Sequence, residues 1–475
     1  MNPIKEAELY RQLVQHFPFT PTHCQTLFMQ RFAAFMAREA QDGMFVLRGY
    51  AGTGKTSLMM ALTEVLPKQK RGVVLLAPTG RAAKVMAGYT GKQAQTIHRR
   101  IYFTRKDKAG GMAFTLQPNK FKNTLFIVDE ASMIADQPTD AKSGSGSTLL
   151  DDLIIFVYSG SGCQLLFLGD TAQLPPVHAT FSPALHADYL RKNFSMEVVE
   201  VELNEVMRQA EDSGILANAT ELRQAFQDDF WDAFTFQCDH FPDIYRMTDA
   251  FDIQDAIQQA YSEYGPSDTC FIVRSNKRAN QYNQQIRTRI LSRESQLSVA
   301  DLVMVVKNNY FWLDDTSEAG FIANGDVLEV LRIEKYSELY GFHFAHVQVQ
   351  MIDYPAQKPF EAVLLLDTLT SESPSLTYAE SNRLYQEVLQ DYADEKSGYK
   401  RLQKIKGNPY FNALQIKFSY AVTCHKAQGG QWPIVFIEQP YLPNGPDADF
   451  IRWLYTALTR AQQKVYLLGF QDSFF

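Results

Sequence analysis

One segment constrains the fold more than any other: residues 49–56 have the sequence GYAGTGKT. An apolar run at Met44–Leu47 precedes it, and a helical pattern at Ser57–Leu66 follows it. A strand, a glycine-rich turn and a helix in this order match GxxxxGK[ST], in which backbone N–H groups turn inward around phosphate groups. The helix N-terminus adds a favourable dipole for the same anion. The sequence therefore predicts a phosphate-binding strand–loop–helix unit.

The residues of this loop have separate expected tasks. Lys55 is expected to contact the β- and γ-phosphates of a nucleotide, and the Thr56 hydroxyl is expected to ligate Mg²⁺. The loop residues expected to bind the nucleotide are Gly49, Ala51, Gly52, Thr53, Gly54, Lys55 and Thr56.

Short apolar runs alternate with helical patterns along much of the chain. The runs in the first half are Met44–Leu47, Val73–Ala77, Leu125–Val128, Leu165–Leu168 and Val198–Val201. A second series comprises Phe271–Val273, Tyr420–Thr423, Ile434–Ile437 and Val465–Leu468. This rhythm is typical of βαβ units, in which parallel strands are covered by helices. The predicted fold class is α/β, with two parallel sheets and flanking helices.

A block with a different pattern lies inside the second series. Gly325–Gln350 shows partial period-2 alternation, which indicates a small antiparallel barrel or sheet. The polar stretch Thr377–Lys406 is predicted to be helical. The block therefore reads as an insertion into the second α/β region. Residues 136–148 (DQPTDAKSGSGST) are rich in Ser and Gly and are predicted to form a flexible loop.

Two adjacent carboxylates, Asp129 and Glu130, follow the apolar run Leu125–Val128. Beside a phosphate loop, Asp129 suits Mg²⁺ coordination and Glu130 suits polarising the attacking water. Phosphoryl transfer also needs a cation that stabilises the negative charge developing on the γ-phosphate. Arg208 in LNEVMRQ and Arg460 in LYTALTRA are the two candidates.

The net charge of −7 at first counts against a nucleic-acid partner, because proteins that bind polyanions are usually basic. The basic residues are unevenly placed, however. Arg99–Asn123 holds seven basic residues and one acid, Asp107, while Arg274–Arg293 holds six basic residues and no acid. Such segments predict sequence-tolerant contacts to a phosphate backbone, with a solvated helix face as the alternative for the second.

The five cysteines are far apart and form no Cys-x-x-Cys pair, so zinc ribbons and a disulfide framework are not expected. The sequence has no apolar segment of signal-peptide type and no run approaching about 18 apolar residues. We expect a reduced, soluble, cytoplasmic protein with no membrane contact.

Eight motifs occur in one order along the chain. They are GYAGTGKT (49–56), APTGRAAK (77–84), TIHR (96–99), VDEASM (128–133), LGDTAQLPPV (168–177), LNEVMRQ (203–209), YAVTCHKAQGGQW (420–432) and YTALTRA (455–461). This set resembles the superfamily 1 helicases of the RecD-like, Dda-like and Pif-type branch. The resemblance covers nearly the whole chain and implies two RecA-like domains of the P-loop NTPase class, with ATP and Mg²⁺ bound between them.

The resemblance also implies domain boundaries. The first RecA-like domain is expected at 1–98 and 124–207, with a β-hairpin wedge at 99–123. The second is expected at 208–325 and 412–475, with an SH3-like insertion at 326–411.

Several site residues follow only from the resemblance. Gln25 in PFTPTHCQ matches the glutamine that reads adenine, and Gln173 matches the γ-phosphate sensor. Arg208 and Arg460 match the arginines supplied from across the cleft, and Gln428 and Gly429 would lie near the nucleotide. The expected catalytic residues are Lys55, Glu130, Gln173, Arg208 and Arg460, with Thr56 and Asp129 on the metal. Those expected on DNA are Pro78, Thr79, Arg81, His98, Arg99, Arg274, Asn276, Lys277, Thr423, His425 and Lys426.

The first basic segment predicts a β-hairpin, because IYFT and MAFTL flank KDKAGG. In the family this hairpin is the wedge that splits the duplex. The expected wedge residues are Phe103, Arg105, Lys106, Lys108 and Phe114. The two phenylalanines would stack at the fork or brace their own turn.

The predicted function is an ATP-dependent, monomeric DNA helicase that moves 5′→3′ on single-stranded DNA and acts on forked DNA in replication, recombination or repair. Its partner proteins are not predicted. The alternatives are an RNA helicase of the same superfamily, a translocase that strips proteins without unwinding, and a binding module switched by nucleotide.

Overall fold

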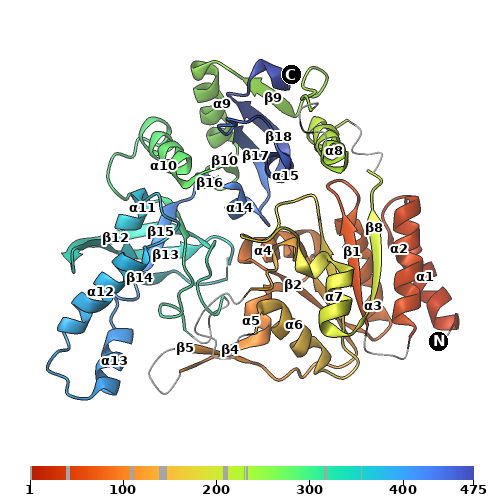
Figure 1. Cartoon of the computed structure of the whole chain (residues 1–475), viewed down its shortest axis with the longest axis horizontal. Helices are drawn as coiled ribbons and strands as arrows, with labels where there is room; N and C mark the ends of the chain where they lie inside the picture. Colours follow the sequence, from red (N-terminus) through yellow and green to blue (C-terminus); the bar gives the residue numbers. More distant parts are fainter. Residues whose placement is uncertain are drawn as a thin grey trace.

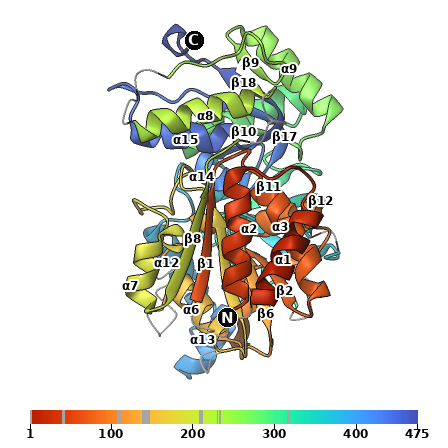
Figure 2. The same cartoon turned by 90° about the vertical axis from the view of Figure 1, so that its right-hand side faces the viewer.

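Two parallel sheets, a small closed barrel and a separate two-stranded hairpin contain the named strands of the protein (Figures 1 and 2). The computed structural model describes residues 3–38, 43–106, 112–137, 147–206, 212–228, 231, 234–314, 317, 319–354 and 356–475. The predicted α/β class with two parallel sheets is confirmed. The core of the predicted loop at 136–148, residues 138–146, lies outside the described residues.

The first sheet is built from six parallel strands, buried between two layers of helices. In order across the sheet they are β3 (Ala94–Thr96), β2 (Gly72–Ala77), β6 (Thr124–Val128), β7 (Gln164–Gly169), β1 (Gly43–Gly49) and β8 (Glu197–Leu203). Helices α1 (Pro3–His16), α2 (His23–Met36) and α3 (Lys55–Lys68) pack on one face. Helices α5 (Ile97–Ile101), α6 (Leu149–Tyr158) and α7 (Ala187–Phe194) pack on the other. Because both faces are covered, β6 and β7 are buried along their whole length.

The second sheet has five parallel strands and lies above the first in Figure 2. Its order is β16 (Ala421–Thr423), β10 (Thr269–Val273), β17 (Trp432–Glu438), β18 (Ala461–Leu468) and β9 (Ile244–Met247). The helices of this half are α8 (Gly214–Gln227), α9 (Ala250–Glu263), α10 (Asn276–Gln285), α14 (Cys424–Ala427) and α15 (Ala448–Leu458). The predicted strands of both sheets are confirmed, while β3 (AQT) and β9 (IYRM) were missed because neither is a continuous apolar run.

The barrel interrupts the second half between β10 and β16. Its strands are β11 (Leu302–Val305), β12 (Val327–Leu339), β13 (Phe342–Met351), β14 (Phe360–Leu365) and β15 (Leu414–Phe418). The predicted alternation at Gly325–Gln350 is confirmed as the antiparallel pair β12–β13. Helices α11 (Asp367–Thr370), α12 (Tyr378–Gln390) and α13 (Gly398–Lys406) follow β14. Strands β11 and β15 lie outside the range 326–411 expected for the insertion.

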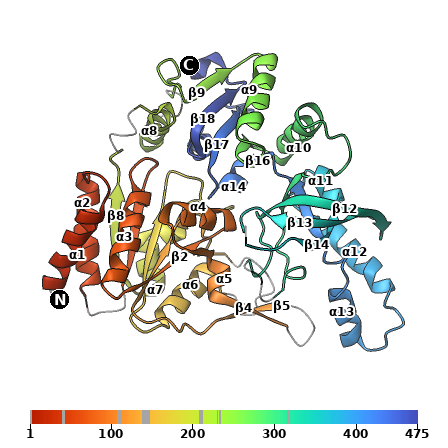
Figure 3. The ribbon, with the colours of Figure 1, turned by 180° about the vertical axis from the view of Figure 1, so that it is seen from behind.

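The hairpin β4 (Tyr102–Lys106) and β5 (Met112–Leu116) is antiparallel, as predicted. The hairpin extends from the first half toward the barrel side of the molecule. Figures 1 and 3, which view the protein from opposite sides, both show this. Its turn, residues 107–111, lies outside the described residues.

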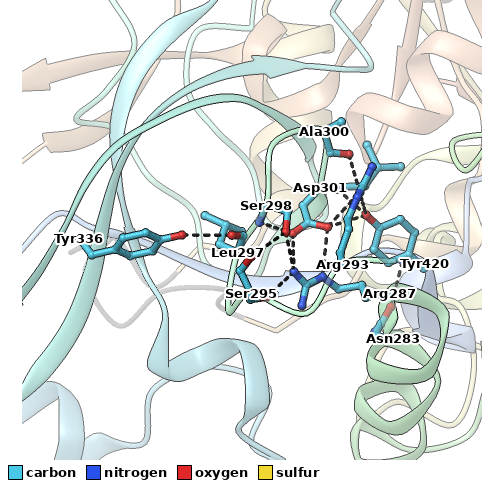
Figure 4. A network of polar contacts seen from close by, with 11 residues as sticks. Asn283, Arg287, Arg293, Ser295, Leu297, Ser298, Ala300, Asp301, Tyr336 and Tyr420 are labelled. Atoms are coloured by element: carbon cyan, nitrogen blue, oxygen red, sulfur yellow. Dashed lines mark hydrogen bonds and ion pairs between the residues drawn. The ribbon is translucent and has the colours of Figure 1, made fainter. Parts of the chain in front are cut away.

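A buried ion-pair cluster joins the barrel to the second sheet (Figure 4). Asp301, one residue before β11, accepts hydrogen bonds from Arg287 at 2.9 and 3.1 Å and from Arg293 at 3.0 Å. The hydroxyl of Tyr420, where the chain leaves the barrel, donates to the same carboxylate at 2.9 Å. The cluster therefore ties together the two points at which the chain enters and leaves the barrel.

This cluster corrects one part of the charge argument. Arg287 is only 1% exposed at its side chain, and its guanidinium stacks 4.2 Å from the Phe418 ring. Arg293 is 19% exposed and paired. The prediction that the whole run Arg274–Arg293 forms a track for nucleic acid was wrong for these two arginines.

Replacing Asp301 with Ala leaves two arginines without their carboxylate, one of them fully buried. We expect a loss of about 3–5 kcal/mol in the free energy of unfolding, because an unpaired buried charge is costly. Urea unfolding followed by tryptophan fluorescence measures this loss. The four tryptophans, at positions 231, 312, 432 and 453, are the fluorescent probes. Glu372→Gln, which breaks an exposed pair with Lys277 at 3.9 Å, is the control. It should cost less than about 1 kcal/mol, and an equal cost for both variants would contradict the prediction.

Candidate active site

The phosphate loop lies between β1 and α3, as the sequence predicts. Gly54 at the N-cap of α3 has φ +83°, a left-handed conformation that favours glycine. The Lys55 ammonium donates to the carbonyl of Gly49 and, at 2.9 Å, to that of Tyr50. The Lys55 side chain therefore folds back over the phosphate loop.

The two predicted carboxylates lie just beyond β6, beside this loop. Asp129 accepts the Tyr89 hydroxyl at 2.6 Å on one oxygen and the Glu130 N–H at 2.9 Å on the other. Glu130 has φ +51°, so its side chain leaves the strand direction and turns toward the second half. Burial raises the pKa of Glu130, opposed by the charge of Arg460.

Arg460 reaches this carboxylate from the second half. Its Nη1 atom lies 3.8 Å from Glu130 Oε1, and its side chain is 3% exposed. The guanidinium also donates to the carbonyls of Thr456 at 3.0 Å and Gly430 at 3.3 Å. The end of α15 thus holds a buried cation against the carboxylate of the first half.

Hydrogen bonds between the two halves close one side of the cleft. The Tyr455 hydroxyl, on α15, donates to Asp170 at 2.6 Å and accepts from the Ala51 N–H of the phosphate loop at 2.9 Å. Leu174 donates its N–H to the Thr456 hydroxyl at 2.9 Å, and its carbonyl accepts from the Gln428 amide at 2.6 Å. Sequence reasoning missed Tyr455 and Asp170, although both lie inside motifs used for the resemblance.

A cavity of about 440 Å³ lies between the two halves. Its lining includes most of the predicted nucleotide residues: Ala51, Gly52, Gly54, Lys55, Thr56, Asp129, Glu130, Gln173, Gly429 and Arg460. Gly49, Thr53 and Gln428 are near it but do not line it. Arg208 lies outside the described residues.

Gln25 is fully buried, and its amide is held by the protein. Its oxygen accepts the Thr22 N–H at 2.9 Å, and its nitrogen donates to the Thr53 carbonyl at 2.9 Å. It thereby connects the start of α2 to the phosphate loop. Phe19 lines the cavity and is 38% exposed, so an aromatic face is available there. The sequence carried only a weak signal for it, the PFTPTHCQ motif.

The oxygen donors at one side of the cavity fit Mg²⁺, which prefers hard oxygen ligands completed by phosphate and water. The Thr56 hydroxyl and the Asp129 carboxylate both line this side. In the described part of the chain, no partner hydrogen-bonds the buried Gln173 Oε1 atom. This orphaned acceptor lines the same cavity, as expected of a residue whose partner is a ligand or its water.

The residues expected on DNA in the first half lie around the start of helix α4 (Gly80–Thr90). Thr79 caps α4 by accepting the Ala82 N–H at 3.2 Å, and Pro78 precedes it. The Arg81 guanidinium lies 4.2 Å from the Trp432 ring of the second half. Arg99 donates to the Ser317 carbonyl at 2.6 Å.

His98 lies deeper than these residues. Its ring is 6.1 Å from that of Phe321, and burial lowers its pKa to about 4. A neutral imidazole at pH 7 follows.

The second-half residues expected on DNA gather at the ends of β10 and β16. Arg274 and Lys277 are exposed, and Asn276 begins α10. Thr423 caps α14, which carries His425 and Lys426. Burial, Arg274 and His178 lower the pKa of His425, and burial lowers the pKa of Lys426 to about 8.

Of the expected wedge residues, only Phe103 has a described side chain, and it is 38% exposed. Arg105, Lys106 and Phe114 lie on the hairpin strands, but their side chains are outside the described part of the structure. Lys108 lies outside the described residues altogether.

No group of three or more His, Cys, Asp or Glu side chains is placed to hold a metal ion within the described part of the chain. None of the helices described there combines the length and apolar character needed to cross a membrane.

Two parallel sheets with a phosphate loop, paired acids and an arginine across the cleft define a P-loop NTPase with two RecA-like halves. Residues 29–237 match the family model of an AAA domain, and residues 418–468 match that of a UvrD-like helicase C-terminal domain. Together with the relatives below, these two matches support the superfamily 1 helicase family.

Several known proteins are similar to part or most of the chain. The ATP-dependent RecD2 DNA helicase of Deinococcus radiodurans is 33% identical over 150 residues, 31% of this chain and 18% of that protein. The multifunctional conjugation protein TraI of Escherichia coli K12 is 33% identical over 152 residues, 31% of this chain and 8% of TraI. The chain thus spans less than a fifth of these two relatives. The ATP-dependent DNA helicase Dda of phage T4 is 23% identical over 447 residues, 88% of this chain and 93% of Dda.

A solved structure of similar arrangement is the Pif1 helicase from Bacteroides in complex with ADP-AlF3 and ssDNA. It is 15% identical, with a TM-score of 0.47, and the match covers 94% of this chain and 92% of that chain.

Gly429 of the second half lies close to the first half beside the cavity. Its φ is +72°, and a Cβ atom there would lie 3.0 Å from Ala82 Cβ and 3.2 Å from the Thr79 hydroxyl oxygen. Gly429→Ala is therefore expected to push the halves apart and to lower ATP turnover by about 10-fold or more, since small misplacements of reacting groups are costly. Steady-state ATP hydrolysis measures it.

Gly469→Ala is the matched control for this variant. Gly469 has a similar φ of +65°, but a Cβ atom there meets no heavy atom within 4 Å. It carries the same backbone strain of about 1–2 kcal/mol without the contact. Equal loss of turnover in both variants would contradict the argument.

Proposed function

We propose that this protein is an ATP-dependent DNA helicase that moves 5′→3′ along single-stranded DNA and separates duplex. The observation that carries the proposal is the Arg460–Glu130 pair at 3.8 Å across the cavity. A hydrolytic carboxylate of one half and a cation of the other meet there only when the halves are together. Nucleotide binding would favour closure, and loss of the γ-phosphate would favour opening.

The proposed chemistry assigns one task to each group of the cavity. Lys55 binds the β- and γ-phosphates, and Thr56 and Asp129 hold Mg²⁺, which neutralises charge on the phosphate oxygens. Glu130 orients and polarises the attacking water, because its carboxylate lines the cavity beside the phosphate loop and faces Arg460. Arg460 stabilises charge developing on the γ-phosphate, and Gln173 senses that group. Arg208 is proposed as the second arginine.

The same motion would act on the DNA. Thr79 and Arg81 in the first half, and Thr423 and His425 in the second, would form two grips on one strand. Opening and closing would move these grips relative to each other, and the hairpin β4–β5 would meet the duplex. The similarity to RecD2 and Dda, both ATP-dependent DNA helicases, supports the choice of DNA. The direction rests on the family resemblance alone. We further propose a monomeric motor and the domain boundaries given above.

Lys55→Ala is expected to abolish ATP hydrolysis stimulated by single-stranded DNA, by about 100-fold or more, because phosphate charge stabilisation is lost. ATP hydrolysis by the variant and by the wild type, each with and without poly(dT), measures this loss. Retained turnover in this variant would sink the proposal. Stimulation by RNA and not by DNA would favour an RNA helicase, and no hydrolysis with any strand would favour a switched binding module.

Forked DNA with a single 5′ or 3′ tail tests direction and strand separation together. Unwinding of the 5′-tailed fork alone is expected. Movement along single strands without unwinding of either fork would favour a translocase that strips proteins.

The depressed pKa of Lys426 predicts a pH effect on DNA binding. Because its pKa is about 8, the ammonium is charged at pH 7 and loses its charge as pH rises through 8. If Lys426 binds a phosphate, the slope of log K against log salt for oligo(dT) should shrink by about 1 between pH 7 and pH 9. The Lys426→Arg variant stays positively charged from pH 7 to pH 9, so its slope of log K against log salt should not change with pH. Identical pH profiles for the two proteins would rule out this contact.

A further inference from the structure

Tyr89, which lies outside the eight sequence motifs, contacts Asp129, the carboxylate expected on the metal. Its hydroxyl donates to Asp129 Oδ2 at 2.6 Å, and its ring packs on the apolar cluster beneath α3. Because a carboxylate oxygen accepts, the phenol is the donor of this hydrogen bond.

This bond fixes the orientation of the carboxylate. The other oxygen of Asp129 accepts the Glu130 N–H at 2.9 Å. With a donor on each oxygen, the carboxylate cannot rotate without losing a charge-assisted hydrogen bond. Groups that hydrogen-bond a metal ligand in this way set its direction and basicity.

Tyr89 also lies near the end of helix α4, which contacts both the second half and the barrel. It lies in the last turn of α4, which spans Gly80–Thr90, about 16 Å at the helical rise. The first turn of α4 contacts the second half, through Arg81 on Trp432 and Ala82 against Gly429. The middle of α4 contacts the barrel, where Lys84 donates to the Ile352 carbonyl at 3.1 Å and to Asp353 at 3.4 Å.

We propose that Tyr89 is a positioning residue that ties the metal-binding carboxylate Asp129 to helix α4, so that the place of α4 between the two halves and the barrel sets how well the site holds Mg²⁺. A strand that draws the halves together at the start of α4 then changes the affinity of the nucleotide site for its metal. The inference rests on the proposed function in assigning Mg²⁺ and ATP to the cavity.

The test is Tyr89→Phe, which removes one hydroxyl and keeps the ring. Binding of a fluorescent, non-hydrolysable ATP analogue is followed while Mg²⁺ is titrated, with and without oligo(dT). The variant is expected to need about 10-fold more Mg²⁺, while its affinity for the analogue in EDTA stays at the wild-type value. The shift that oligo(dT) causes in the Mg²⁺ requirement of the wild type should shrink in the variant.

Tyr340→Phe is the matched control, because that phenol also donates to a carboxylate, Asp391, but lies on the barrel at the β12–β13 turn. It should leave the Mg²⁺ titration unchanged. A wild-type Mg²⁺ titration in Tyr89→Phe would overturn the proposal, as would an equal loss of affinity with Mg²⁺ and in EDTA, which indicates a structural role only. If the wild type hydrolyses no ATP with any strand, the proposed function fails, yet the Mg²⁺ titration still decides the role of Tyr89.

Discussion

The hydroxyl of Tyr455 holds together the two halves on which the nucleotide cavity depends. It donates to Asp170 and accepts from the Ala51 N–H, so three polar groups from two halves satisfy one another away from water. Burial and Asp170 raise the pKa of Tyr455 far above its ordinary value, which keeps the phenol a donor. Buried polar groups left unpaired are costly, so a partial separation is unfavourable. The contact therefore favours two arrangements of the halves. In one, Tyr455, Asp170 and Ala51 are hydrogen-bonded to one another, and in the other all three are hydrated.

The sequence was sufficient to predict the sheets and much of the nucleotide side, because those features depend on local order. A buried parallel strand reads as an apolar run, and the phosphate loop is a continuous segment. The acids Asp129 and Glu130 were found for the same reason, since they follow a strand directly. Strands β3 and β9 were missed because polar residues interrupt them, so they do not read as apolar runs. Strands β11 and β15 pair only when segments more than 100 residues apart meet.

Residues whose roles depend on distant partners were harder to predict. Tyr89 and Tyr455 look like ordinary core tyrosines on helices, and only the fold brings their hydroxyls to Asp129 and Asp170. Charge was misleading in the same way. Arg287 belongs to a basic run in the sequence, but a turn of helix directs it inward to Asp301. Four exposed basic residues of this run remain for the predicted track: Arg274, Lys277, Arg278, which pairs with Glu438, and Arg289.

The segment Gln173–His178 connects the cavity to the surface where a strand is proposed to bind. Gln173 lines the cavity, and the backbone of Leu174 is held by Thr456 and Gln428 of the second half. Pro175 and Pro176 follow, and their rings fix φ and stiffen the path. Beyond them His178, with φ +68°, is close enough to His425 to lower the pKa of that imidazole. Because this short segment is stiff and is held from the second half, displacement of Gln173 moves His178 with it. If nucleotide binds at Gln173 and a strand binds near His425, as proposed, this short segment would couple the two sites through backbone geometry.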